Sequence, residues 1–261
     1  MKNLFSVEGK VALVTGGSRG IGEMIAAGFL ANGVKVYISS RKAEVCDATA
    51  ERLMAEQGGE CISIPADISS AAGAEYLAGE IAGREDRLDI LVNNAGAVWA
   101  APLEEFPESG WDKVMNTNLK APFYLTKALL PQLRAAASAD KPARVINIGS
   151  IDALTIPSIE NYSYTAAKAG LHYLTQVLAA KLASDDILVN TIAPGAFQSQ
   201  MMAETIRVHG DRIRASNPRK RIGMPEDIAG VAIFLSSRAS AYTTGALITC
   251  DGGRSTAVFG T

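Results

Sequence analysis

Tyr164 and Lys168 stand four residues apart in a stretch with helical character. This spacing places a phenol and an ammonium group one turn apart on the same face of a helix. A free phenol has a pKa of about 10 and exchanges protons poorly at neutral pH, whereas a close cation favours the phenolate. The pair therefore predicts proton transfer by Tyr164, with Lys168 supplying part of the lowering of the tyrosine pKa and a positively charged nicotinamide ring the rest.

Ser150 offers a hydroxyl at the end of an apolar stretch, Arg144–Gly149, that is typical of a strand. Open α/β sheets bind their ligands beyond the carboxyl ends of the strands. A hydroxyl there could hold a substrate oxygen while Tyr164 exchanges the proton, which is the positioning that hydride transfer needs. Tyr162 lacks a lysine four residues later, so we interpret it as a wall of the substrate cleft.

A glycine-rich turn near the N-terminus is a second candidate site. It reads Thr15-Gly16-Gly17-Ser18-Arg19-Gly20-Ile21-Gly22, with the spacing Gly-xxx-Gly-x-Gly, and it lies between an apolar strand and a helix. Glycines let the backbone turn tightly, and they let amide groups and the helix dipole approach a pyrophosphate. The context predicts a dinucleotide cofactor.

The type of dinucleotide is indicated by Ser39, Ser40 and Arg41 at the end of the second predicted strand. An NAD-binding protein usually places an acid at this point for the ribose hydroxyls. Arg41 could instead bind the 2′-phosphate of NADP, and Arg19 could approach the same phosphate from the other side. We therefore expect NADP(H); the alternative is that either arginine is a solvated surface residue.

Short apolar stretches rich in β-formers alternate with longer helical ones along the chain, a pattern typical of a parallel sheet covered on both faces. It predicts an α/β fold: one Rossmann-type, doubly wound, seven-stranded sheet. The expected strands are Val11–Thr15, Val34–Ser39, Cys61–Pro65, Leu88–Val92, Arg144–Gly149, Leu188–Ile192 and Leu247–Cys250. The expected helices are Gly22–Asn32, Ala43–Glu56, Ala71–Gly83, Trp111–Ala137, Ser163–Ala183 and Pro225–Ser236.

No repeat or linker divides the chain, so we expect residues 1–261 to form a single domain. Pro122 should bend the long helix that contains it. Residues 196–217 match no core strand, and we interpret them as a mobile helical flap that controls substrate access. Four flap side chains could line an acyl-accepting cleft or simply pack: Phe197, Met201, Met202 and Ile206.

The composition argues against several other functions. A net charge of −2 gives no basic field for nucleic acid or anionic membranes. Cys46, Cys61 and Cys250 are far apart, which fits reduced thiols in a cytoplasmic protein. His172 and His209 have no neighbouring Cys or acidic cluster, so no metal site is expected. No apolar stretch reaches the roughly 20 residues of a membrane span.

These residues together resemble the short-chain dehydrogenase/reductase family over essentially the whole chain. The resemblance implies a small-molecule carbonyl or alcohol substrate and a homotetramer or homodimer, with Pro225–Ser236 and Ala246–Cys250 as the candidate interface. The matching positions are Thr15–Gly22, Asp67, Asn93-Asn94-Ala95-Gly96, Asn118, Ser150, Tyr164 with Lys168, Pro194-Gly195 and Asp251-Gly252-Gly253.

The resemblance also implies roles for individual residues. Ser150 would orient the carbonyl and Tyr164 would act as general acid/base. Lys168 would bind the nicotinamide ribose, and Asn118 would hold a relay water, although Asn118 or Asn116 could merely bond the backbone. Asp67 and Ile68 would face the adenine, and Pro194 to Ser199 would cover the nicotinamide. The implied cofactor-binding residues are Gly16, Ser18, Arg19, Gly20, Ile21, Gly22, Ser40, Arg41, Asp67, Ile68, Asn94, Ala95, Gly96, Tyr164, Lys168, Pro194, Gly195, Phe197 and Ser199.

The expected function is hydride transfer between NADP(H) and a ketone or secondary alcohol. The stretch Pro142–Ser150 and the alanine-rich loop before it resemble the 3-oxoacyl-acyl-carrier-protein reductase branch associated with rhamnolipid synthesis, which implies an acyl thioester substrate. A sugar or polyol dehydrogenase of the same family is the alternative. A non-catalytic NADP-binding regulatory module is a different class, and the complete Ser150, Tyr164 and Lys168 set argues against it.

Overall fold

Seven strands form one parallel sheet in the order β3-β2-β1-β4-β5-β6-β7. The computed structural model describes residues 2–199 and 202–256. The strand order reverses between β1 and β4, and a doubly wound sheet binds ligands at such a switch point. The strands are β1 (Val11–Thr15), β2 (Lys35–Ser39), β3 (Cys61–Ser63), β4 (Ile90–Asn93), β5 (Ala143–Ile148), β6 (Ile187–Pro194) and β7 (Leu247–Cys250).

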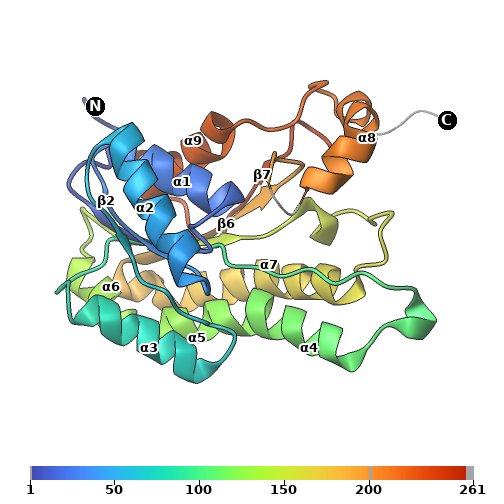
Figure 1. The fold of residues 1–261 in the computed structure, drawn as a ribbon. Helices are drawn as coiled ribbons and strands as arrows, with labels where there is room; N and C mark the ends of the chain where they lie inside the picture. The colour runs from blue at the N-terminus through green and yellow to red at the C-terminus, as the bar shows by residue number, and fades with distance from the viewer. Residues whose placement is uncertain (1, 200–201, 257–261) are drawn as a thin grey trace.

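Helices cover both faces of this sheet (Figure 1). Along β1, Ala12 and Val14 pack with one set of helices, whereas Val11 and Leu13 pack with the other, because side chains alternate along a strand. The first set is α1 (Gly20–Ala31), α2 (Ala43–Gln57) and α9 (Pro225–Ser236). The second is α3 (Ala71–Ala82), α5 (Ala121–Ala128), α6 (Leu130–Ala136) and α7 (Tyr162–Leu182).

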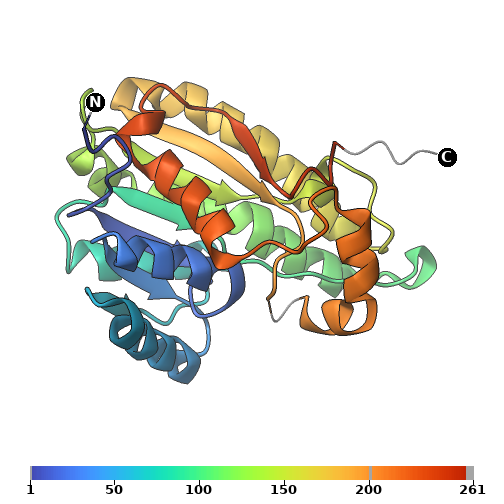
Figure 2. The same cartoon turned by 90° about the horizontal axis from the view of Figure 1, so that it is seen from above.

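Helices α1 and α9 lie side by side on the first face (Figure 2). The glycine at position 28 allows this approach, since a Cβ atom there would lie only 2.5 Å from the Cβ atom of Ala229. The contact fixes α9 beside the helix that follows the glycine-rich turn. It therefore links the last part of the chain to the predicted cofactor end.

The predicted fold class is confirmed, and the observed strands differ from the predicted ones by at most two residues at either end. The long helix Trp111–Ala137 was predicted wrongly as one element. It consists of α4 (Glu108–Met115), a π-helical turn at Asn116–Lys120, α5 and α6. Pro122 occupies the first turn of α5, where it is tolerated, and Pro131 begins α6 after a second break at Leu129.

The predicted flap contains a helix, α8 (Ala203–Ser216). The backbone before and after it meets at one point. The amide of Gly223 donates to the carbonyl of Ala196 over 2.9 Å, and Phe197 forms an isolated β-bridge with Gly223. Residues 198–222 therefore leave the sheet region and return to it at a common base. Met201 lies outside the described residues.

Within residues 2–199 and 202–256, no helix is both long and apolar enough to cross a membrane.

Candidate active site

The glycine-rich turn lies at the carboxyl end of β1 and leads into α1. Gly16 and Gly20 both have positive φ angles, +64° and +58°, which only glycine adopts without strain. Gly22 packs on the turn itself, since a Cβ atom there would lie 2.4 Å from the carbonyl oxygen of Gly16. No side chain caps the first amides of α1 at Arg19, so these donors fit an anionic pyrophosphate.

The turn is braced by residues that follow β4. The Asn94 side chain donates to the carbonyls of Thr15 (2.9 Å) and Gly16 (3.2 Å). The hydroxyl of Thr15 accepts hydrogen bonds from the amides of Asn94 and Ala95. The structure thus brings Asn94 and Ala95 against the glycine-rich turn, and their hydrogen bonds fix the shape of the turn.

The end of β2 offers polar groups beside this turn. The Ser40 hydroxyl is buried without a hydrogen-bond partner among the described residues, and the next residue, Arg41, is exposed. The hydrogen bond from the Ser69 amide lowers the pKa of the Asp67 carboxyl group, and the charge of Arg41 adds a smaller effect in the same direction. An unpartnered hydroxyl next to a guanidinium fits a phosphate oxygen. Ile68, in contrast, is buried in the core.

Ser150, Tyr164 and Lys168 lie together beyond the carboxyl end of β5. Ser150 directly follows that strand and its loop glycine, and Tyr164 and Lys168 come from the first two turns of α7. Burial raises the pKa of the Tyr164 phenol, and Ser150 lies close enough to oppose that rise. The ammonium group of Lys168 lies 5.7 Å from the centre of the Tyr164 ring. The predicted catalytic trio is therefore assembled in one place.

Burial, rather than the charge of Lys168, is the largest influence on the pKa of Tyr164. Burial raises the pKa of Tyr164 to about 12; the Ser150 hydrogen bond opposes this rise, and the charge of Asp152 adds to it. The Lys168 ammonium donates instead to the carbonyl of Ile148 over 2.6 Å, and its burial lowers its own pKa to about 8. Desolvation thus outweighs the nearby cation, and Tyr164 is a neutral phenol at neutral pH.

Asn118 is fully buried in the π-helical turn. Its amide group is bonded on both sides to Ala97: the side-chain oxygen accepts from the amide, and the side-chain nitrogen donates to the carbonyl, both over 2.8 Å. The Asn118 side chain therefore bonds the backbone, as the alternative to a relay-water role proposes. These bonds hold the loop after β4 in place. Because both polar atoms of this side chain are already bonded, a relay water would have to bind another group, such as a backbone carbonyl of the π-helical turn.

Two residues that contact Ser150, His172 and Asp152, were not predicted as site residues from the sequence. The Ser150 amide donates to Nε2 of His172 over 3.3 Å, and the Asp152 amide donates to the Ser150 hydroxyl over 3.1 Å. His172 lies one further turn along the face of α7 that carries Tyr164 and Lys168. The spacing of four residues after Lys168 is the sequence signal that places His172 on this face.

The start of the flap lies over the glycine-rich turn. Pro194 ends β6, and the amide of Gly195 donates to the carbonyl of Cys250 over 3.0 Å. A Cβ atom at Gly20 would lie 3.0 Å from the Cβ atom of Ser199. The structure therefore brings this segment above the turn, while Phe197 is buried at the base of the flap.

A family described as Enoyl-(Acyl carrier protein) reductase matches residues 16–255. The rhamnolipids biosynthesis 3-oxoacyl-[acyl-carrier-protein] reductase of Pseudomonas aeruginosa is 49% identical over 97% of this chain and 99% of its own length. The chain belongs to the short-chain dehydrogenase/reductase family.

Solved structures of other short-chain dehydrogenases/reductases have the same fold. The Pseudomonas aeruginosa RhlG/NADP active-site complex matches with a TM-score of 0.94 and 49% identity, covering 98% of this chain and 100% of that one. A putative 2-deoxy-D-gluconate 3-dehydrogenase from Agrobacterium tumefaciens with bound NADP matches with a TM-score of 0.86 and 39% identity, covering 98% and 100%.

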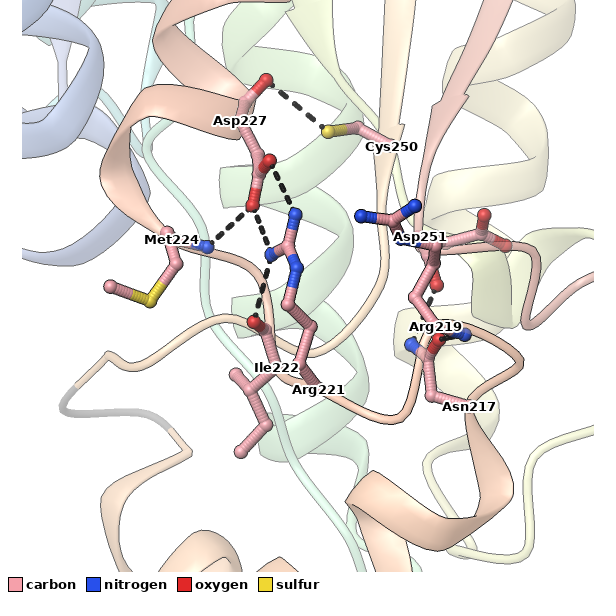
Figure 3. Close-up of polar contacts among 8 residues, drawn as sticks. All are labelled: Asn217, Arg219, Arg221, Ile222, Met224, Asp227, Cys250 and Asp251. Atoms are coloured by element: carbon pink, nitrogen blue, oxygen red, sulfur yellow. Dashed lines mark hydrogen bonds and ion pairs between the residues drawn. The ribbon is translucent and has the colours of Figure 1, made fainter.

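In this short-chain dehydrogenase/reductase, the segment at the end of the predicted flap and just after it is bonded to α9 and to the residue after β7 (Figure 3). Arg221 forms two hydrogen bonds with the carboxylate of Asp227, one of them 2.8 Å long. The Asn217 side chain donates to the carbonyl of Asp251 over 2.9 Å. Arg221, Asp227 and Asp251 line a cavity of about 350 Å³ that extends to Phe197. The anchor thus holds the residues that follow α8 while leaving space beside the base.

The Arg221–Asp227 pair predicts acid sensitivity of the flap anchor. The Arg221 guanidinium holds the pKa of Asp227 at about 2, below its ordinary value, so the pair stabilises the fold above about pH 4 and this contribution is lost as the pH falls toward 2. Because both groups are partly exposed, we expect Asp227→Asn to lower Tm by only about 2 °C at pH 7.

Scanning calorimetry at several pH values tests this expectation. The difference in Tm between the wild type and Asp227→Asn should shrink below pH 4 and vanish near pH 2. Asp211→Asn is the matched control, because Asp211 pairs with Arg214 on exposed α8 and its loss should change Tm little. A difference that persists unchanged at pH 2 would contradict the assignment.

Proposed function

We propose that this short-chain dehydrogenase/reductase is an NADP(H)-dependent carbonyl reductase of the cytoplasm that acts on 3-oxoacyl thioesters. The observation that carries the proposal is the assembly of the Ser150 hydroxyl, the Tyr164 phenol and the Lys168 ammonium at the end of β5, beside a glycine-rich cradle. A regulatory module has no evident need for this set of groups.

NADP(H) fits the residues that the structure brings together. The uncapped amides of α1 would hold the pyrophosphate, and Ser40 with Arg41 would hold the 2′-phosphate. Lys168 would bind the nicotinamide ribose, as the family resemblance implies. NADPH, when bound, supplies the hydride.

The neutral phenol of Tyr164 suits the direction of reduction. As the carbonyl carbon becomes tetrahedral, its oxygen gains negative charge and takes the phenol proton. The Ser150 hydroxyl oxygen accepts a hydrogen bond from the Asp152 amide, so its proton can be directed toward the substrate oxygen. Proton donation and oxygen binding thus come from two groups that already lie close together, which lowers the cost of positioning.

The thioester class is supported by the surface around this site. The loop between Ser150 and Tyr164 exposes apolar side chains, with Ile156 at 99% and Leu154 and Ile159 about half exposed. Figures 1 and 2 place α8 on the same side of the molecule. Residues 203–221, which are α8 and the stretch after it, contain six Lys or Arg and two Asp or Glu, in a chain of net charge −2. An apolar chain joined to an anionic carrier group matches both features.

A sugar or polyol substrate is the second candidate, and one observation favours it. Asp152 is half-buried beside Ser150, and its carboxylate accepts a hydrogen bond from Asn161 over 3.2 Å. A carboxylate next to the reacting groups could accept hydrogen bonds from substrate hydroxyls. A 2-deoxy-D-gluconate 3-dehydrogenase is also named among the similar structures.

A substrate panel read by NADPH absorbance separates the two candidates. We expect 3-oxoacyl thioesters to give kcat/KM at least about tenfold above that of sugar acids and small diketones, rising with chain length because each buried methylene contributes about 0.8 kcal/mol. Coenzyme A and N-acetylcysteamine thioesters of the same acyl chain show whether the anionic carrier contributes. Turnover of sugar acids alone would replace the thioester assignment, and NADPH binding without any turnover would favour a regulatory module.

We also propose that the chain assembles as a homotetramer or homodimer through α9 and β7. β7 is an edge strand, and the unpaired backbone groups of an edge strand favour pairing with another chain. Thr249 on this strand is exposed, as is Tyr242 just before it.

A further inference from the structure

Two side chains of α7 bind the backbone on either side of Gly149, between the end of β5 and Ser150. The Lys168 ammonium donates to the carbonyl of Ile148 over 2.6 Å. One turn later, Nε2 of His172 accepts from the amide of Ser150 over 3.3 Å. A donor thus meets the carbonyl and an acceptor meets the amide, so α7 fixes both polar groups of this short stretch.

The imidazole also fills the space under the backbone. A Cβ atom at position 149 would lie 2.1 Å from Nε2 of His172 and 2.9 Å from the Cγ2 atom of Thr191. Glycine is therefore required at this position, and the peptide that leads into Ser150 cannot move toward α7. The contact is closely packed as well as hydrogen-bonded.

His172 can accept this hydrogen bond only as neutral imidazole, with its proton on Nδ1. Burial and the positive charge of Lys168 lower the pKa of His172 to about 4. The imidazole is therefore neutral at neutral pH, and the acceptor is present under the conditions in which the enzyme works.

We propose that His172 is a positioning residue that holds the Ser150 backbone so that the serine hydroxyl faces Tyr164. The inference rests on the proposed reductase function, in which Ser150 holds the substrate oxygen. In that function Lys168 also binds the cofactor ribose. Of the two side chains of α7 that bond this stretch of backbone, His172 is therefore the one whose role does not depend on the cofactor. It acts through Ser150 and does not touch the reacting atoms.

Two substitutions at position 172 test the proposal. His172→Gln can present an amide oxygen near the position of Nε2, whereas His172→Leu has similar size and no acceptor. With acetoacetyl-coenzyme A as the probe, we expect His172→Leu to lower kcat about 10- to 100-fold and leave the Kd for NADPH within about 2-fold. His172→Gln should retain kcat within about 3-fold.

A second readout does not depend on activity. Hydrogen exchange of the Ser150 amide in the cofactor-free protein should be at least about tenfold faster in His172→Leu than in the wild type, and close to the wild-type rate in His172→Gln. His172→Asn serves if the leucine variant fails to fold, because its amide is polar but too short to reach Ser150, so it should behave like His172→Leu.

Thr175→Val is the matched control for general destabilisation. Thr175 lies on the next turn of α7 and bonds the side chains of Asn147 and Thr191 in the core, away from Ser150. It should lower Tm and leave kcat per bound NADPH unchanged. Unchanged kcat per bound NADPH in His172→Leu would overturn the positioning role. Wild-type protein that turns over no carbonyl substrate would instead overturn the proposed function.

Discussion

Replacing Tyr164 by phenylalanine is expected to lower kcat for carbonyl reduction by about 10³-fold or more. The substitution removes the proton donor and one partner of Ser150, and a positioned general acid contributes about 10²- to 10⁴-fold. The aromatic ring remains, so the Kd for NADPH should stay within about 3-fold. Steady-state turnover and fluorescence titration with NADPH measure the two quantities separately.

Tyr162→Phe is the control for this change, since Tyr162 lies two residues earlier and its hydroxyl bonds Glu160 at the surface. It should keep kcat within a few-fold. Because burial raises the pKa of Tyr164 to about 12, the phenol stays protonated at neutral pH, and ionisation of Tyr164 should not limit reduction between roughly pH 6 and 9. Full turnover by a folded Tyr164→Phe protein would show that the proton comes from another group.

Replacing Arg41 by aspartate is expected to raise the Kd for NADPH by about 10²- to 10³-fold and to change the Kd for NADH by less than about 3-fold. The substitution removes charge-assisted bonds, each worth roughly 1.5–3 kcal/mol, and adds repulsion against the 2′-phosphate. Only NADPH carries that phosphate. Fluorescence titration of both cofactors gives the ratio.

Lys42→Asp is the matched control, because it makes the same change in charge one residue later at the start of α2. It should affect both cofactors weakly and equally. Equal weakening of NADPH and NADH by Arg41→Asp would mean that Arg41 does not recognise the 2′-phosphate.

The sheet and the glycine-rich turn could be predicted because their causes are local. Buried parallel strands are continuous apolar stretches, and a turn such as that around Gly16 and Gly20 requires residues that tolerate positive φ. The order of Ser150, Tyr164 and Lys168 along the chain also sufficed to bring them together, since strand ends and following helix starts meet at one edge of the sheet.

The remaining features depend on contacts between distant residues. The π-helical turn at Asn116–Lys120 exists where Asn118 bonds Ala97, a partner 21 residues away. The direction of the Tyr164 pKa depends on how deeply the phenol is buried, which spacing does not reveal. The role of His172 depends on the contact of its ring with Gly149, a residue outside α7.

The joined base of residues 198–222 has an evolutionary consequence. Because Ala196 and Gly223 are already bonded to each other, the segment between them can change in length or sequence at a small entropic cost and without moving β5 or α7. We therefore expect the predicted flap to be exchangeable among relatives while Ser150, Tyr164 and Lys168 stay in place. Transplanting this segment from a relative should transfer substrate preference while the proton donor and the cofactor cradle stay in place.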